Sequence, residues 1–394
     1  MKILTFSTLY PNSRQASHGI FVENRLRQLL GYAPEVEARV IAPVPWFPFK
    51  HPLFGEYAKF AGVEKTETRH GIDVVHPRYL VIPKIGMGWT PGLLYRAVRP
   101  YVQAVRDQGF DFDLIDAHYF YPDGIAAMRL AQEFGRPFTV TGRGTDLNLI
   151  PQYAGPREQI LEVTREAAHM MTVAGALKDY LREMGVADDR ATVLRNGVDL
   201  NFFQPPSDRS TLREAVAYTQ RPTLLSVGHL IERKGHHLVI EAMQQLPEFD
   251  LVIAGDGPEA AALKQLVERM GVQSQVTFAG RLGQEALRQH YQAADALVLA
   301  SSREGWANVL LEAMACGTPV VATPVDGTPE VVAAPAAGRL TPDRSAAGVA
   351  ASVKALFADL PERAATRAYA EGFSWDETSQ GQLDIFRRAI AAGV

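Results

Sequence analysis

The sequence predicts an α/β protein built from two doubly wound, Rossmann-like domains. The first observation is length, because 394 residues exceed what one hydrophobic core usually holds. The second is a recurring order of apolar run, turn and amphipathic stretch, which is typical of parallel βαβ units. The third is a polar break with two prolines at 202–208, after which the same order starts again.

The first domain is predicted from apolar runs that lack polar alternation, as expected for strands buried on both faces. Amphipathic segments between the runs indicate helices. The predicted strands are 2–7, 38–42, 114–117, 138–141, 170–173 and 191–194, and the predicted helices include 20–30, 125–133 and 159–167.

The second domain repeats this order, so we assign residues 1–205 to the first domain and 206–372 to the second. Its predicted strands are 223–227, 250–254, 275–278, 296–300 and 319–322, and its predicted helices are 238–245, 259–270, 284–293 and 309–315. Ligands of such sheets bind beyond the carboxyl ends of the strands. We therefore expect the functional site in a cleft between the domains.

Composition narrows the class of protein. A formal net charge of −4 argues against bulk nucleic-acid binding. The single cysteine, Cys316, excludes an internal disulfide and fits a reducing compartment. The apolar run at 2–7 is shorter than a secretory h-region, and no window approaches the roughly 18 apolar residues of a membrane span. We expect a cytoplasmic protein that is not integral to a membrane.

The most specific motif spans residues 302–319. A predicted strand ends, a loop carries Glu304, and a helix begins near Asn308 with Glu312 in its early turns. The start of a helix favours an anion such as a diphosphate, and carboxylates beside it would suit sugar hydroxyls. The alternative for either glutamate alone is a solvent-facing residue.

This segment resembles the E-x7-E signature of glycosyltransferase family 4, which has the GT-B fold, and the likeness extends over nearly the whole chain. The resemblance implies that Glu312 holds the ribose hydroxyls of a nucleotide-sugar donor and that Glu304 approaches its hexose. The helix start would contribute the remaining donor contacts, from Trp306, Ala307, Asn308 and Val309.

The segment 226–235 resembles the family's G-R-L-x-x-x-K-G loop, whose basic residues neutralise the diphosphate. Lys234 matches the lysine, whereas His229 stands where arginine is usual, so Arg233 is expected to supply the missing charge. Arg281 and Leu282 resemble the segment that lies against the base. For both segments the alternative is an ordinary strand–turn–helix connection.

Four first-domain residues follow predicted strands and resemble family positions. His118 matches a histidine that contacts the donor hexose, and Gly19 stands where the family often has two glycines near the phosphates. His18 and Asp146 are acceptor-side candidates. The alternatives are a satisfied structural histidine for His118 and a helix cap for Asp146.

The resemblance implies a retaining transfer of a hexosyl group from a nucleotide-diphosphate sugar to a saccharide or lipid-linked acceptor. It places the chain among bacterial enzymes of surface polysaccharide biosynthesis, with no metal and no cofactor. Two other functions stay open: a nucleotide-sugar 2-epimerase on the same fold, and a non-catalytic, two-lobed sugar-binding protein.

Three further segments complete the prediction. The aromatic and basic stretches 46–60 and 84–99 have three interpretations: contact with the inner membrane face, an acceptor-site lid, or packing into the first domain. The resemblance also implies that the C-terminal segment 373–394 returns to the first domain as a helix.

Overall fold

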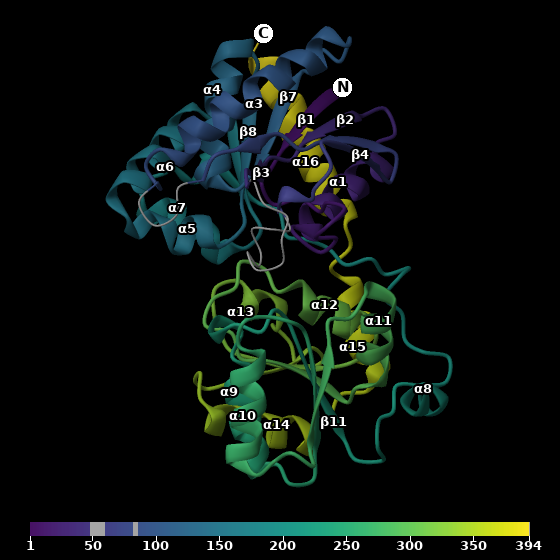
Figure 1. The fold of residues 1–394 in the computed structure, drawn as a ribbon. Helices are drawn as coiled ribbons and strands as arrows, with labels where there is room; N and C mark the ends of the chain where they lie inside the picture. Colours follow the sequence, from purple (N-terminus) through teal and green to yellow (C-terminus); the bar gives the residue numbers. More distant parts are fainter. Residues whose placement is uncertain (48–59, 82–85, 394) are drawn as a thin grey trace. The chain divides into compact units, whose positions relative to one another are not determined.

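The chain forms two compact α/β units. The structure, a computed structural model, describes residues 1–47, 60–81 and 86–393. One unit comprises Met1–Asn196 and Trp375–Val394, and the other comprises Gly197–Ser374. Each unit has its own largely parallel sheet covered by helices (Figure 1). This arrangement confirms the doubly wound α/β class that the sequence predicts.

The sheet of the first unit has the strand order β10-β9-β8-β7-β1-β2-β5-β4. Neighbouring strands are parallel except β4 and β5, which pair as an antiparallel hairpin at the sheet edge. The strands are β1 (Lys2–Phe6), β2 (Glu37–Ile41), β4 (Thr66–Arg69), β5 (Ile72–Val75), β7 (Leu114–His118), β8 (Phe138–Gly142), β9 (His169–Thr172) and β10 (Ala191–Val193). A separate pair joins β3 (Val44–Pro45) to β6 (Arg78–Tyr79).

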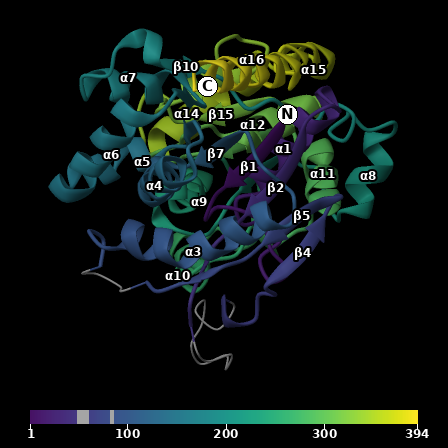
Figure 2. The same cartoon turned by 90° about the horizontal axis from the view of Figure 1, so that it is seen from above.

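The helices of the first unit pack on both faces of this sheet. The C-terminal helix α16 lies beside α1 in both ribbon views (Figures 1 and 2), because Leu383 and Phe386 join Leu29 and Ile3 in one buried cluster. The main helices are α1 (Ile20–Tyr32), α3 (Thr90–Asp107), α4 (Ile125–Phe134), α6 (Ala154–Glu166), α7 (Gly175–Glu183) and α16 (Asp376–Ala392); the shorter ones are η2 (Phe120–Gly124), α5 (Thr145–Asn148), η3 (Ile150–Gln152) and η4 (Asp188–Arg190).

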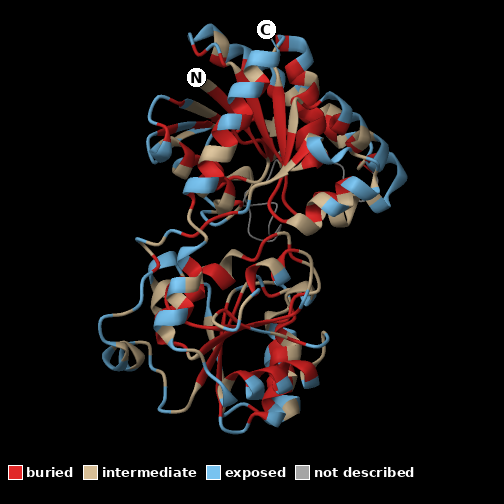
Figure 3. Cartoon of the chain, turned by 180° about the vertical axis from the view of Figure 1, so that it is seen from behind, coloured by how far each residue is buried: buried red, intermediate tan, exposed pale blue. Residues whose placement is uncertain are grey.

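The sheet of the second unit is parallel, in the order β13-β12-β11-β14-β15-β16. Its strands are β11 (Thr223–Val227), β12 (Asp250–Ala254), β13 (Val276–Gly280), β14 (Ala296–Leu299), β15 (Val320–Ala322) and β16 (Gly338–Leu340). Its helices are α8 (Arg209–Ala215), η5 (Glu232–Lys234), α9 (His236–Ala242), η6 (Met243–Gln245), α10 (Ala260–Met270), α11 (Gln284–Ala293), α12 (Asn308–Ala315), α13 (Thr328–Val331), α14 (Ala346–Ala358) and α15 (Arg363–Glu371). The central strands of both units, such as β7, β8, β11 and β12, are buried at every residue, and the helices contribute further buried residues (Figure 3).

The boundary between the units differs from the sequence prediction. Residues 197–205, assigned above to the first domain, belong to the second unit. The Val198 amide donates to the Phe373 carbonyl at 3.0 Å, and Arg367 donates to the carbonyl oxygens of Leu200 and Phe203 at 3.2 and 2.6 Å. These bonds hold the connector on the second unit, so the break falls at Asn196 rather than at the prolines.

The sequence prediction misses helix α3, most of which lies in the aromatic and basic stretch 84–99. Leu94 and Val98 are buried, so this part of the stretch is an amphipathic helix of the first unit. The hairpin β4–β5 is also missed.

Residues 48–59 and 82–85, which hold most of the stretch 46–60 and Lys84, lie outside the described residues. No helix in the described ranges combines the length and apolarity that crossing a bilayer requires.

Candidate active site

The loops at the carboxyl edge of the second sheet carry most of the donor-side candidates. From β11 the chain adds β12 and β13 on one side and then returns to add β14 on the other. The switch point therefore lies between β11 and β14, where ligands of open α/β sheets bind. The loop after β11 carries Lys234, and the loop after β14 carries Glu304.

These two loops meet in an ion pair. Lys234 Nζ donates to Glu304 Oε1 at 2.5 Å, and Ser301 Oγ donates to the same oxygen at 2.7 Å. Arg233 Nη1 lies 3.9 Å from Glu304 Oε2 and donates to the Arg303 carbonyl at 2.8 Å. The sequence-predicted residues Lys234, Arg233 and Glu304 therefore form one cluster.

The close approach of the loops depends on Gly235. This residue has φ +72°, and a Cβ there would lie 1.9 Å from the Ala300 carbonyl oxygen. Only glycine combines this backbone conformation with this contact. The Ser302 amide also donates to the Arg233 carbonyl at 2.8 Å. The glycine in the sequence motif therefore sets the distance between the lysine and the glutamate.

Glu304 is ionised in this cluster. Its side chain is only 8% exposed, and burial alone would raise its pKa. The charge of Lys234 and the hydrogen bonds from Lys234 and Ser301 outweigh burial, so the pKa of Glu304 is lowered. The Lys234 side chain is 16% exposed and has one hydrogen bond to Glu304, so its ammonium group can still donate to an anion.

Glu312 lies in a different environment on helix α12. Its carboxylate accepts a hydrogen bond from the Tyr291 hydroxyl at 2.8 Å. Burial raises the pKa of Glu312 to about 7, although the bond from Tyr291 opposes the shift. A carboxylate poised near neutrality can accept hydrogen bonds from vicinal hydroxyls when it is ionised.

The remaining donor-side candidates follow the strand ends as the sequence predicts. Trp306, Ala307, Asn308 and Val309 form the start of α12, where no side chain caps the helix. His229 is exposed, and its Nδ1 lies 2.5 Å from the Asp256 carbonyl oxygen. Arg281 and Leu282 follow the edge strand β13, so β12 and β11 separate their strand from β14.

His118 in the first unit is fully engaged within the protein. Arg143 Nη2 donates to its Nδ1 at 2.6 Å, and its Nε2 lies 3.1 Å from Asp116 Oδ2. Because arginine only donates, Nδ1 is the acceptor and Nε2 carries the proton. Burial lowers the pKa of His118 to about 4, so the ring is neutral at pH 7. A direct contact with a ligand would require one of these bonds to break.

The Asp146 side chain binds the backbone around the start of α5. Its carboxylate accepts hydrogen bonds from the amides of Phe120, Arg143 and Gly144 at 2.8, 3.0 and 2.8 Å. Burial raises the pKa of Asp146, and these bonds oppose the shift. Asp146 is not a helix cap, because it lies inside α5, whose N-cap position is Gly144 and has no side-chain hydrogen bond.

Gly19 and His18 end the loop between β1 and α1. Gly19 has φ +63°, and a Cβ there would lie 2.2 Å from the Leu9 carbonyl carbon, so the position requires glycine. His18 Nε2 lies 3.1 Å from the Thr8 carbonyl oxygen. The start of the same loop is bound to Asp123, which accepts from the Thr8 amide and hydroxyl at 2.7 and 2.9 Å.

Sequence reasoning missed three residues that organise these loops, namely Asp123, Tyr291 and Asp326. Asp123 is fully buried. In the sequence it is the one charged residue between His118 and Arg129, and this pattern could have identified it. Burial raises its pKa to about 8, against the hydrogen bonds from Thr8. Tyr291 looks like an ordinary core residue in the sequence, because only the fold brings its hydroxyl to Glu312.

Two Rossmann-like units, one with an ion pair at its switch point, define a class of two-domain α/β proteins. Comparison with known proteins narrows this class. Residues 208–373 match the family model for glycosyl transferases group 1, and residues 24–202 match the model for glycosyltransferase family 4.

Two relatives cover most of the chain. The putative teichuronic acid biosynthesis glycosyltransferase TuaC of Bacillus subtilis (strain 168) is 27% identical over 332 residues, 83% of this chain and 82% of TuaC. The D-inositol 3-phosphate glycosyltransferase of Xylanimonas cellulosilytica is 30% identical over 311 residues, 73% of this chain and 74% of the relative. The chain therefore belongs to glycosyltransferase family 4 and is a transferase, which selects this function over the epimerase and the binding protein.

Solved structures agree on the fold. Sucrose-phosphate synthase (tll1590) from Thermosynechococcus elongatus superposes with a TM-score of 0.80 at 20% identity, over 100% of both chains. Anabaena Alr3699/HepE in complex with UDP-glucose has a TM-score of 0.75 at 22% identity, over 98% of both chains. The chain has the GT-B fold.

Proposed function

We propose that the protein transfers a hexosyl group, with retention of anomeric configuration, from a nucleoside diphosphate sugar to a saccharide or lipid-linked acceptor. The observation that carries this proposal is the pair of Lys234 and Glu304 at the switch point of the second sheet. The ammonium group suits a diphosphate, and the buried carboxylate suits sugar hydroxyls.

The chemistry follows from where charge develops. The anomeric C–O bond to the diphosphate breaks through an oxocarbenium-like state, and negative charge builds on the leaving group. Lys234 and Arg233 stabilise that charge, as preorganised donors do in a site sheltered from water. The acceptor hydroxyl forms the new glycosidic bond, and its proton passes to the departing phosphate on the same face of the sugar. No protein nucleophile is needed in this scheme.

Glu312 is proposed to hold the ribose of the donor. Glu312 lies in the second turn of α12, the helix that follows the carboxyl-edge loop of β14, and the Tyr291 hydroxyl donates to its carboxylate. Structures of Alr3699/HepE with UDP and with UDP-glucose support a uridine nucleotide as the first donor to test. We propose that the reaction needs no metal and no cofactor, because Lys234 and Arg233 supply two cations beside Glu304 that could take the place of a metal ion.

A role in surface polysaccharide biosynthesis in the cytoplasm is proposed on the similarity to TuaC. Contact with the inner membrane face is supported by an apolar groove on the first unit. Trp89 and Leu80 are 64% and 46% exposed there, and Arg96 and Arg129 flank them. Arginines beside exposed aromatic side chains suit an anionic lipid surface. Flotation with phosphatidylglycerol vesicles, compared with Trp89→Ser and Arg96→Ser variants, tests this contact.

The donor site is tested by thermal-shift measurements with UDP, GDP, ADP and their sugars, each with and without EDTA. We expect one nucleoside diphosphate to raise the Tm, EDTA to leave this shift unchanged, and Glu312→Ala to abolish it. Glu268→Ala on the exposed face of α10 is the matched control. A shift that disappears with EDTA would overturn the metal-free reaction, and no shift with any nucleotide would overturn the donor site.

A further inference from the structure

Asp326 lies beside the candidate active site without belonging to any motif used above. It follows β15 in the turn that leads to helix α13, and it is half-buried. Its backbone has φ +43°, a left-handed conformation that side-chain-bearing residues rarely adopt. Aspartate and asparagine tolerate this conformation better than other such residues. A strained residue beside a site invites a test of its role.

The Asp326 carboxylate holds the backbone of Glu304. Its Oδ2 accepts the Glu304 amide at 2.9 Å. The Glu304 side chain is bound separately, by Ser301 and Lys234. Glu304 is therefore held at both ends, by its amide from the β15 side and by its carboxylate from the β11 and β14 side.

A second contact makes the β15 loop a support for the β14 loop. Strands β14 and β15 are parallel neighbours, so their following loops leave the same sheet edge. Thr323 Oγ1 donates to the Ser301 carbonyl at 2.6 Å, and the Thr323 amide donates to the Leu299 carbonyl at 3.1 Å. The β15 loop therefore binds the β14 loop at two points, through Thr323 at Ser301 and through Asp326 at Glu304. The Glu304 side chain binds Lys234.

We propose that Asp326 is a positioning residue for the transfer reaction, which fixes the Glu304 loop through the Glu304 amide. This rests on the proposed function of Glu304 as a contact of the donor hexose. Because Asp326 binds the Glu304 amide while the Glu304 carboxylate keeps its partners Ser301 and Lys234, we expect Asp326 to set the alignment of the sugar and to leave nucleotide binding intact. Small errors in alignment are costly in such reactions.

Two substitutions separate the effect of losing the Asp326 carboxylate from the effect of its left-handed backbone conformation. Asp326→Gly removes the acceptor and keeps the left-handed backbone at no steric cost, whereas Asp326→Asn keeps an acceptor oxygen and tolerates the backbone. We expect Asp326→Gly to lower kcat about 10- to 100-fold with an unchanged Kd for the nucleoside diphosphate. Asp326→Asn should stay within about threefold of wild type. A wild-type kcat in Asp326→Gly overturns the proposal, and so does a loss of nucleotide binding in that variant.

A double-variant cycle tests the route through Glu304. If Asp326 acts through Glu304, Asp326→Gly combined with Glu304→Gln should be no slower than Glu304→Gln alone. Effects that multiply would overturn the proposal. Amide hydrogen exchange at residues 302–306 provides a readout that needs no substrate: exchange should be at least about tenfold faster in Asp326→Gly and unchanged in Asp326→Asn. Unchanged exchange in Asp326→Gly overturns the proposal, whereas a wild-type protein that binds no nucleotide overturns the proposed function.

Discussion

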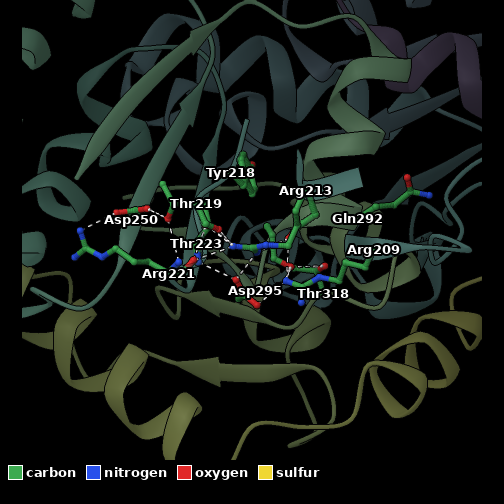
Figure 4. A network of polar contacts seen from close by, with 12 residues as sticks. Arg209, Arg213, Tyr218, Thr219, Arg221, Thr223, Asp250, Gln292, Asp295 and Thr318 are labelled. Carbon is green, nitrogen blue, oxygen red and sulfur yellow. Dashed lines mark hydrogen bonds and ion pairs between the residues drawn. The ribbon is translucent and has the colours of Figure 1, made fainter. Parts of the chain in front are cut away.

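The second unit has a carboxylate between two cations at each edge of its sheet, and the two clusters differ in how completely they are bonded. At the amino edge, Asp295 binds Arg209 at 2.5 Å, Arg213 at 2.8 Å and the Thr223 amide at 2.8 Å (Figure 4). At the carboxyl edge, Glu304 binds Lys234 and Ser301, with Arg233 at 3.9 Å.

The two clusters differ in how many other hydrogen bonds their cations make. Arg213 also donates to the carbonyls of Ala293, Thr219 and Arg221, and Arg209 donates to Ala293 and Ala294. These donors are largely used inside the protein, so the amino-edge cluster fastens α8 to the sheet. Lys234 keeps donor capacity, so the carboxyl-edge cluster can bind a ligand. The amino-edge cluster is therefore structural, whereas we propose a role in the transfer reaction for the carboxyl-edge cluster.

The largest expected effect is on catalysis at the carboxyl edge. Lys234→Ala should lower kcat about 10²- to 10³-fold, because one preorganised donor to the leaving group is lost. The Tm should also fall, because the buried Glu304 carboxylate loses its ion-pair partner, so kcat is compared per folded molecule. Steady-state assays with the donor identified by thermal shift measure this change, with Lys354→Ala on the exposed face of α14 as the control. A wild-type kcat in Lys234→Ala would contradict the proposal that the carboxyl-edge cluster takes part in catalysis while the amino-edge cluster is only structural.

The next effect is on stability at the amino edge. Asp295→Ala leaves two arginines without their carboxylate and should cost about 2–3 kcal/mol, a drop of about 5–10 °C in Tm. Activity per folded molecule should not change. Scanning calorimetry measures this drop, and Asp359→Ala, whose side chain is 89% exposed, should shift the Tm by less than about 2 °C. An inactive but stable Asp295→Ala protein would contradict the structural role.

A smaller effect concerns pH and Glu312. Because the carboxylate must be ionised to accept ribose hydroxyls and its pKa is about 7, nucleotide affinity should fall about 5- to 10-fold between pH 8 and 6. The pH dependence of folding stability has the opposite sign to that of nucleotide affinity. A folded-state pKa above the ordinary value of 4.5 contributes stability at low pH, and this contribution is lost as pH rises through about 7.

Glu312→Gln checks both signs, since it should flatten the pH dependence of affinity and raise the Tm relative to wild type at pH 8. Calorimetric titration with the nucleotide and Tm measurements between pH 5.5 and 8.5 provide the data. The same pH slope of affinity in wild type and Glu312→Gln would assign the titration to another group.

The smallest effect is expected at His229, where the family usually has arginine. His229→Arg adds a permanent charge at an exposed position, which should tighten nucleoside diphosphate binding about two- to fivefold at pH 8. Gln265→Arg on α10 adds the same charge elsewhere and should have no effect. Weaker binding in His229→Arg would show that the contact between His229 and the Asp256 carbonyl matters more than charge.

The sequence by itself determined the sheet strands that are apolar throughout and the loops that follow them. A strand such as Thr223–Val227 is buried on both faces, so its residues must all suit the core, and the sequence shows this directly. The resemblance to the family motifs also predicted that Lys234 and Glu304 belong to one site, and the two side chains do meet. The helix α3 was missed because Pro100 lies inside it, and proline is unfavourable within a helix.

Only the tertiary structure decided which partners each of these residues has. The contacts from Asp326 to Glu304 and from Tyr291 to Glu312 join residues more than twenty positions apart, on loops and helices that the strand order brings together. The same holds for His118, whose two nitrogens are occupied by Arg143 and Asp116. Spacing along the chain carries no information about such bonds, because they depend on the register and order of the strands.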